Sequence, residues 1–149
     1  MTNNLSLSYR QARILSHVCG GMYYGGPTYR FAKKDMTRRE KLTFLSFLYD
    51  KLDYDYLHQR LRMQHPDLLG DKTDEEVDLE TWRKAEDVII DIPITPRQFN
   101  LCIRAFATTF EESIIDNYRD LEIITGFPIA EIRQVYEKML QTRSEMESL

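Results

Sequence analysis

Apolar residues recur at intervals of three and four along most of this chain, which is the spacing of one face of an α-helix. The first such stretch extends from Tyr9 to about Val18, and Ser6 or Ser8 can cap its start. It ends at Cys19-Gly20-Gly21, because glycine readily adopts the left-handed conformation that stops a helix. Short breaks of this kind separate the later amphipathic stretches, so the pattern predicts a helical protein.

The broadest apolar face follows Thr37-Arg38-Arg39-Glu40, which fits a capping box because the Thr hydroxyl and the Glu carboxylate can each accept a backbone hydrogen bond. We expect this helix to be central to the core. It can continue to Met63 or break near Asp53-Tyr54-Asp55, and Pro66 ends it. The positions predicted to form its stripe are Leu42, Leu45, Tyr49, Leu52 and Tyr56, with Phe44, Leu48 and Leu57 widening it.

Three more capping sequences divide the second half of the chain. Thr73-Asp74-Glu75-Glu76 and Thr95-Pro96-Arg97-Gln98 each predict a helix start, and Thr109-Phe110-Glu111-Glu112 predicts a cap and a break. Between the first two, Ile90–Ile94 alternates like a strand but is short and contains a proline, so we expect an extended connector with buried isoleucines. The stripe expected of the next helix, which ends at Gly126, is Ile114, Ile115, Tyr118, Leu121 and Ile124. A last amphipathic helix follows Phe127-Pro128.

The stretches add up to six or seven helices with short connections. The fold class that this predicts is all-α, a compact orthogonal bundle forming a single domain over residues 1–149. Its exception is a glycine- and tyrosine-rich region near the N-terminus, where Gly25-Gly26-Pro27 is a turn signal. We therefore expect Met22–Phe31 to be a loop or a short irregular hairpin.

Charge is distributed unevenly between the two parts of the chain. Residues 1–65 hold eleven Lys/Arg against five Asp/Glu, a net charge of +6, and residues 66–149 hold nine against nineteen, a net charge of −10. The segment Asp71–Asp91 alone contains nine acids and three bases. Such a distribution predicts a dipolar surface that steers charged partners, unless the two parts pack on each other.

Composition indicates the cellular compartment in which we expect the protein. Two widely spaced cysteines do not make a disulfide scaffold, and a reducing compartment is expected. The first ten residues lack the apolar region of a signal peptide, and no apolar run is long enough to span a bilayer. We therefore expect a cytoplasmic protein that does not bind membranes, with its oligomeric state open.

The candidate catalytic residues do not assemble into a recognised site. Cys19 lies at a helix C-terminus, where the dipole raises a thiol pKa, and Cys102 falls on an apolar face. The pattern of His17 with Cys19 lacks the further ligands that a zinc site needs. No phosphate-binding or nucleophile motif is present, so we expect no enzyme, no cofactor and no metal.

One motif keeps an enzymatic alternative open. The spacings Arg10…His17 and Arg60…His65 are similar to the paired motif of small helical ribonucleases of the HEPN type. A second polar residue of that motif is not convincingly placed in either case. An enzyme of another type would use His17 or His65 as general base, beside a second polar group.

The residues that we predict to bind a partner lie in the basic, aromatic opening of the chain. They are Tyr23, Tyr24, Tyr29, Arg30, Lys33, Lys34, Arg38 and Arg39. Tyrosine and arginine are enriched in the cores of protein interfaces, which favours a small non-enzymatic regulator or inhibitor that binds a protein. The alternative is a nucleic-acid-binding regulator, because the same cations can neutralise phosphates and the same rings can stack on bases.

A second feature bears on nucleic acid. Within residues 115–140, the run from Leu121 to Ile132 resembles a helix-turn-helix, with Gly126 in the turn and an apolar residue six positions later. Glu122 stands where a small apolar residue is usual, and Asp116 and Asp120 lie close by in the sequence. These acids would repel phosphate, so a plain helix–turn–helix joint is the favoured interpretation.

Overall fold

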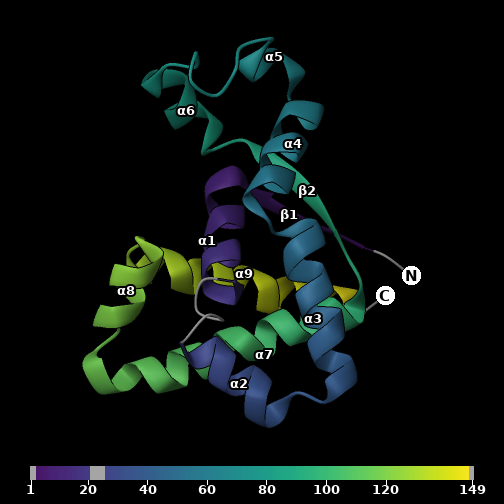
Figure 1. Cartoon of the computed structure of the whole chain (residues 1–149), viewed down its shortest axis with the longest axis vertical. Helices are drawn as coiled ribbons and strands as arrows, with labels where there is room; N and C mark the ends of the chain where they lie inside the picture. Colours follow the sequence, from purple (N-terminus) through teal and green to yellow (C-terminus); the bar gives the residue numbers. More distant parts are fainter. Residues whose placement is uncertain (1–2, 21–25, 148–149) are drawn as a thin grey trace.

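The computed structural model describes residues 3–20 and 26–147, and this part of the chain is predominantly α-helical (Figure 1). The elements in chain order are β1 (Asn3–Ser8), α1 (Tyr9–Cys19), α2 (Pro27–Asp35), α3 (Arg38–Lys51), α4 (Tyr54–Gln64), α5 (Pro66–Leu69), α6 (Leu79–Ala85), β2 (Ile89–Ile94), α7 (Pro96–Ser113), the 3-10 turn η2 (Ile114–Asp116), α8 (Arg119–Thr125) and α9 (Ile129–Glu147). The predicted helical class is confirmed. The described residues hold nine α-helices, three of them with seven residues or fewer, and orthogonal packing of six or seven stays a prediction. None of the described helices is long and apolar enough to cross a membrane.

Helix α7 organises the larger end of the molecule (Figure 1). It packs against α1, α2, α3 and α9. Phe99 and Phe106 on α7 are almost completely buried, and Tyr136 of α9 stacks on Phe106 with ring centroids 5.8 Å apart. Burying each of these rings contributes roughly 1.5–3 kcal/mol, so this helix anchors the core.

A two-stranded antiparallel sheet ties the start of the chain to its middle. Strand β1 pairs with β2 in a register that places Leu5 opposite Ile92. The isoleucines of β2 are buried as expected, but the prediction of an unpaired connector was wrong. Pro93 is tolerated because each strand of a two-stranded sheet is an edge strand. The partner strand lies more than eighty residues away in sequence, beyond the reach of local periodicity.

Two predicted capping boxes form as expected, and Ser8, one of the two caps predicted for the first helix, also forms a box. Ser8 with Gln11, Thr37 with Glu40, and Thr95 with Gln98 each exchange the two reciprocal hydrogen bonds at the starts of α1, α3 and α7. Thr73 and Glu76 also bond to each other, but they close a turn rather than start a helix. The helix starts at Leu79 instead, capped by Asp78.

Helix α3 presents apolar side chains to two sides. It ends at Lys51, so of the two predicted alternatives the break near Asp53 is the one that the structure shows, and continuation to Met63 is not. Phe47 and Leu48 are buried, whereas Leu42 and Tyr49 from the predicted core stripe are 63% and 60% exposed. When a helix has two apolar faces, the periodicity of its sequence does not identify which face is buried. In α3, contact with α7 determines the buried face.

Two boundaries around α2 and α7 differ from the sequence-based expectation. Of the loop or hairpin predicted over residues 22–31, residues 22–25 lie outside the described part of the chain, and residues 27–31 are helical because Pro27 occupies the first turn of α2. The buried Thr28 hydroxyl bonds to the Val18 carbonyl oxygen and lies 3.2 Å from the Thr109 hydroxyl. That contact buries Thr109 inside α7, and the break predicted there was wrong.

Helix α7 ends at Ser113, and Ile114–Asp116 continue as the 3-10 turn η2. Asn117 and Tyr118 adopt the left-handed conformation, with φ of 55° and 65°. The predicted continuous stripe through Ile114 and Ile115 therefore does not form. Both isoleucines lie at the surface, 62% and 94% exposed.

Candidate docking surface

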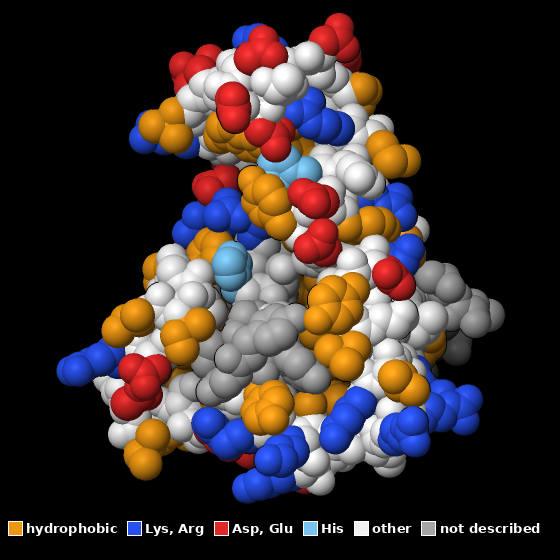
Figure 2. Space-filling model, viewed as in Figure 1, with side chains coloured by type: hydrophobic (Ala, Val, Ile, Leu, Met, Phe, Trp, Pro, Cys, Tyr) orange, Lys and Arg blue, Asp and Glu red, His pale blue; other side chains and the backbone are white. Residues whose placement is uncertain are grey.

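The basic and acidic parts of the sequence pack on each other, since α7 from the second part contacts α1, α2 and α3 from the first. Charged side chains nevertheless gather at different ends of one face of the molecule (Figure 2). Lys and Arg side chains gather at the end formed by α2 and the start of α3, and Asp and Glu side chains crowd the end formed by α5 and α6 (Figure 2). The condition set for the dipolar surface, that the two parts do not pack on each other, is not met, but the face in Figure 2 still carries its cations and its acids at different ends. An anionic partner would be steered toward the α2–α3 end.

The predicted partner-binding residues divide into three groups. Tyr23 and Tyr24 lie outside the described residues. Tyr29 and Arg30 are exposed on α2. The remaining four are exposed on α2 and the first turn of α3, make no hydrogen bond or ion pair with another described residue, and are named here the basic strip: Lys33, Lys34, Arg38 and Arg39.

Arg30 has an internal role that the other cations lack. Its Nη2 donates to Glu112 Oε2 at 2.8 Å, and its Nε lies 3.2 Å from both oxygens of the same carboxylate. This bidentate pair fastens α2 to the C-terminal end of α7. Arg30 therefore serves mainly to hold α2 against α7, and its charge is already paired.

A hollow with a mixed apolar and acidic lining lies at the N-terminal end of α2. It encloses about 230 Å³, and its lining includes the apolar Ile115, Ile124, Leu121 and Pro27, the acids Asp116 and Asp120, and the Arg30–Glu112 pair. Ile115 is 94% exposed and Ile124 is 53% exposed. Ile114 and Ile123 are also exposed nearby in the sequence, and we name the four side chains the isoleucine patch.

Strained backbone supports the isoleucine patch. Tyr118 is a bulky residue in the left-handed region, a conformation that costs of order 1–3 kcal/mol. Its ring packs against Phe110, and the Arg133 guanidinium lies over both rings, 5.4 Å and 5.7 Å from their centroids. This cluster holds the turn that directs Ile115 outward, and strain of this kind concentrates at functional surfaces.

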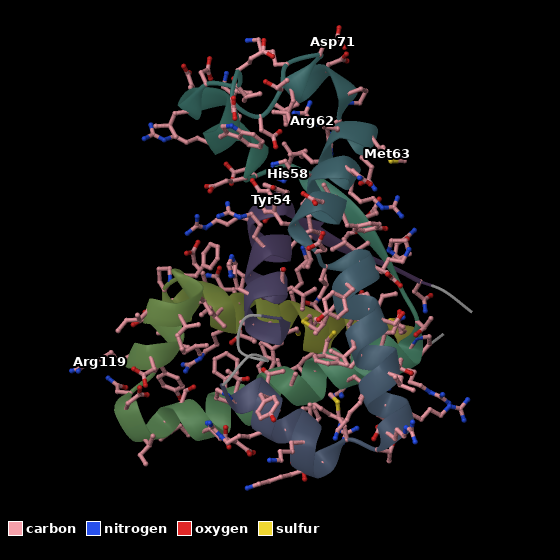
Figure 3. The ribbon with its side chains drawn as sticks, in the orientation of Figure 1. Tyr54, His58, Arg62, Met63, Asp71 and Arg119 are labelled. Atoms are coloured by element: carbon pink, nitrogen blue, oxygen red, sulfur yellow. The ribbon has the colours of Figure 1, made fainter. Side chains whose placement is uncertain are left out.

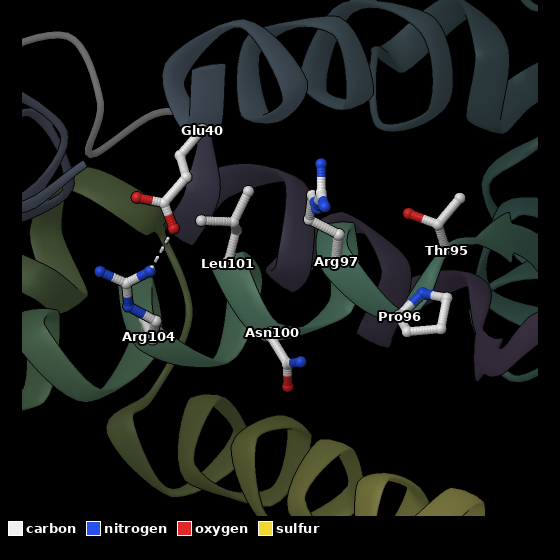
Figure 4. Close-up of a pocket in the computed structure, with 7 residues that line it drawn as sticks. All are labelled: Glu40, Thr95, Pro96, Arg97, Asn100, Leu101 and Arg104. Carbon is white, nitrogen blue, oxygen red and sulfur yellow. Dashed lines mark hydrogen bonds and ion pairs between the residues drawn. The ribbon is translucent and has the colours of Figure 1, made fainter. Parts of the chain in front are cut away.

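A more open groove of about 540 Å³ lies at the other end of α2, between the starts of α3 and α7 (Figure 4). Arg104 Nη1 donates to Glu40 Oε2 at 2.7 Å, and Nη2 donates to the Asp35 carbonyl oxygen. The backbone N–H of Thr37 and the Arg104 guanidinium lower the pKa of Glu40. Arg97 also lines the groove and adds positive charge beside the basic strip.

The helix-turn-helix-like segment forms a tight joint. Gly126 takes the left-handed conformation between α8 and α9, with φ of 76°. Glu122, the residue that departs from the motif, accepts a hydrogen bond from the Ile129 N–H at 2.8 Å. Glu131 binds Arg10 at 2.7 Å. The start of α9 therefore already carries two carboxylates, and a DNA phosphate would meet them there.

The predicted catalytic candidates are not brought together. Cys19 and Cys102 are both buried, and burial, followed by contact with Cys102, raises the pKa of Cys19. Burial and the nearby Arg13 lower the pKa of His17, which lies against Phe127. His65 Nε2 lies 2.6 Å from the Ile89 carbonyl oxygen. Within the described residues, no three metal-ligating side chains form a group.

The arginines of the ribonuclease-like pairs are engaged elsewhere. Arg10 binds Glu131 and Glu86, and Arg60 Nε donates to the Tyr56 hydroxyl at 2.7 Å. Neither arginine bonds to the histidine of its pair within the part of the chain that is described. This arrangement lends the ribonuclease-like motif no geometric support.

Comparison with protein-family models, with curated proteins and with solved structures gives no match. Function must therefore be argued from the surface itself. The isoleucine patch is the part of this surface that sequence reasoning missed, because Ile115 and Ile124 fit a helical stripe. The adjoining Asn117 is a weak signal, since asparagine tolerates the left-handed conformation better than most residues.

Proposed function

We propose that this protein is a non-enzymatic regulator or inhibitor that acts by binding a protein partner. The partner contacts the docking surface, defined as the exposed side of α2 with the basic strip at one end and the isoleucine patch at the other. The observation that carries the proposal is this adjacency of exposed aliphatic side chains and cations without partners among the described residues. Exposed apolar patches with a polar rim are typical of protein-interaction sites.

The isoleucines favour a protein over a nucleic acid. Nucleic acids are bound through phosphate neutralisation and stacking on aromatic rings, and an aliphatic side chain supplies neither. Burying Ile115 against a partner would contribute roughly 1.5–3 kcal/mol, because most of its surface is accessible. The basic strip would accelerate encounter with an acidic partner and fix its orientation.

The test is affinity purification from the native host with and without nuclease. We expect a protein partner that survives nuclease treatment. The double variant Ile115→Ser/Ile124→Ser should reduce its recovery at least tenfold, since about 1.4 kcal/mol corresponds to a factor of ten in affinity. Ile89→Ser is the matched control, because Ile89 is 48% exposed on β2 and lies outside the lining of the hollow.

Two results would contradict the proposal. One is a partner that is lost entirely on nuclease treatment. The other is equal recovery by the double isoleucine variant and the Ile89→Ser control. Thermal unfolding of the variants must match that of the natural chain for the comparison to count, and the high exposure of these side chains makes this the expected result.

Nucleic-acid binding is the second candidate, and the arginine-lined groove beside the basic strip favours it. Arg97 and the basic strip present cations over the α3 and α7 helix starts, whereas Arg104 is already paired with Glu40. In this case, affinity would fall steeply with added salt, and neutralising Lys33, Lys34, Arg38 and Arg39 together would flatten that dependence. The isoleucine variants would bind nucleic acid as the natural chain does, which separates the two candidates.

A further inference from the structure

A second hollow, away from the docking surface, lies where α1, α4 and α6 meet. It encloses about 300 Å³, the lower end of the range for small-molecule sites, and its walls include Tyr9, Tyr54, His58, Trp82 and Arg83. Figure 3 shows Tyr54 and His58 turned from α4 toward α1 and α6. The wall residues come from three segments of the chain, so the fold assembles this hollow from distant parts of the sequence.

His58 is the buried residue of this hollow that contacts Tyr9, Tyr54 and Trp82. It is 7% exposed, and its Nδ1 lies 2.7 Å from the Tyr9 hydroxyl oxygen. Nε2 is buried without a hydrogen-bond partner among the described residues, and Asp74 Oδ2 lies 3.6 Å away. In the tautomer with a proton on Nε2, which that carboxylate favours, the Tyr9 hydroxyl donates to Nδ1. The imidazole orientation is thereby fixed before any ligand enters.

Aromatic rings surround the imidazole. The centroids of Tyr54 and Trp82 lie 4.2 Å and 5.1 Å from that of His58, and Tyr9 meets it edge-on at 5.6 Å. Tyr54 is 58% exposed and Trp82 is partly exposed, so both rings can be reached from solvent. Exposed rings around a preformed hollow suit a planar group that stacks or packs edge-to-face.

The charged side chains that line the hollow favour a negative ligand, although acids crowd the surrounding α5–α6 end of the molecule (Figure 2). Glu86 lies 3.2 Å from Arg13 and 3.4 Å from Arg10, and Arg10 is also paired with Glu131. Arg83 is exposed at the rim and makes no ion pair with another described residue. Burial lowers the pKa of His58, so the imidazole is neutral near pH 7. Arg13 and Arg83 against Glu86 leave one positive charge on the lining, and the nearby Asp74 carboxylate is itself paired with Arg62 at 2.8 Å.

We propose that the α1–α4–α6 hollow binds a small molecule in which a planar ring of one or two fused cycles carries one anionic group. The ring packs against Tyr54 and Trp82, and the anionic group pairs with Arg83. A nucleoside monophosphate and an aryl carboxylate share this chemistry and are the two sources to distinguish. The proposal is independent of the docking surface, since the two sites share no lining residue.

Trp82 makes the test direct, because it is the single tryptophan of the chain and part of the wall. Trp82 is excited at a wavelength longer than those that adenine absorbs. Its emission is followed during titration with adenosine monophosphate and with benzoate, and thermal unfolding is recorded alongside. We expect at least one probe to change the emission and to raise the unfolding temperature. Adenosine and inorganic phosphate, each lacking one half of the chemistry, should bind at least tenfold more weakly.

Variants complete the design. Arg83→Gln and Tyr54→Ala, both at exposed positions, should each weaken binding about tenfold. Arg119→Gln on α8, far from the hollow in Figure 3, is the matched control and should leave binding unchanged. The proposal is overturned if neither anionic probe perturbs Trp82, if adenosine binds as well as its monophosphate, or if Arg83→Gln and Arg119→Gln behave alike.

Discussion

The two hollows differ in what their walls already do for the fold. In the α1–α4–α6 hollow, His58 is buried, bonded to Tyr9 and packed among three rings. In the hollow beside α2, Ile115 and Ile124 are exposed and add little to the packing of the monomer. A wall whose side chains already stabilise the folded protein is preorganised for a small ligand. Exposed apolar side chains contribute burial free energy only when a partner covers them.

This comparison predicts opposite responses of stability and binding to substitution. Changes around His58 should cost stability in the isolated protein. Changes in the isoleucine patch should leave stability unchanged and weaken capture of a partner.

The largest effect is expected for His58→Ala. The substitution removes a buried ring from contact with Tyr9, Tyr54 and Trp82 and leaves the Tyr9 hydroxyl without its partner. We expect the free energy of unfolding to fall by about 2–4 kcal/mol, measured as a lower urea midpoint at constant m-value. Ile115→Ser is the control and should change it by less than about 0.5 kcal/mol. Similar losses in both variants would remove the distinction between the two walls.

Tyr9→Phe isolates the hydrogen bond within that cluster. The ring stays in place, but the His58 Nδ1 atom loses its hydroxyl donor in a buried site. A loss of about 1–3 kcal/mol in urea unfolding is expected, since an unsatisfied buried polar atom keeps its desolvation penalty. Tyr54→Phe alters a 58%-exposed tyrosine on the same wall and should be close to neutral. A neutral Tyr9→Phe would show that the bond contributes nothing net.

Stability should fall as the pH drops through the ordinary histidine range. Burial lowers the pKa of His58 in the folded state below its usual 6.5, so the unfolded chain binds the proton more readily. Stability is therefore full above about pH 6.5 and declines as the pH falls toward the folded-state pKa. His17 is shifted in the same direction, so urea midpoints at pH 7.5 and 5.5 should be compared in His17→Gln and in His17→Gln/His58→Gln. Equal pH dependence in both variants would exclude His58 as the source.

The smallest effect is expected for the Arg10–Glu131 ion pair, which joins α1 to α9. Its two hydrogen bonds are 2.8 Å and 2.7 Å long, and each side chain remains about a third exposed. Solvent screening limits such a pair to about 0.5–1 kcal/mol. A double-mutant cycle with Arg10→Gln and Glu131→Gln measures the coupling. A coupling energy of several kcal/mol would mean that the α1–α9 junction is far less hydrated than its exposure indicates.

Local rules predicted much of this fold because their partners are close in sequence. The boxes at Ser8, Thr37 and Thr95 each need only the residue three positions later, and all three form. The β1–β2 pairing could not be predicted, because Leu5 and Ile92 meet only after the intervening helices have packed. Periodicity likewise could not reveal that Tyr118 turns left-handed, which places Ile115 at the surface.

The candidate sites were predictable to different degrees. The exposure of Lys33 and Arg38 follows from their charge and their position in the first basic stretch. The hollow around His58 was not foreseen, since the chain separates Tyr9, His58 and Trp82 by tens of residues and no motif marks them. Side chains that are brought together only by the tertiary fold have no characteristic spacing in the sequence by which they could be recognised.

The most direct test of the docking surface places a photo-crosslinking amino acid at position 115 and, in a separate chain, at position 89. Both positions are exposed isoleucines, but only the first lines the hollow beside α2. After irradiation in the native host and nuclease treatment, we expect a discrete protein adduct at position 115 that is absent at position 89. Identical adducts at both positions, or none at position 115, would contradict the docking surface.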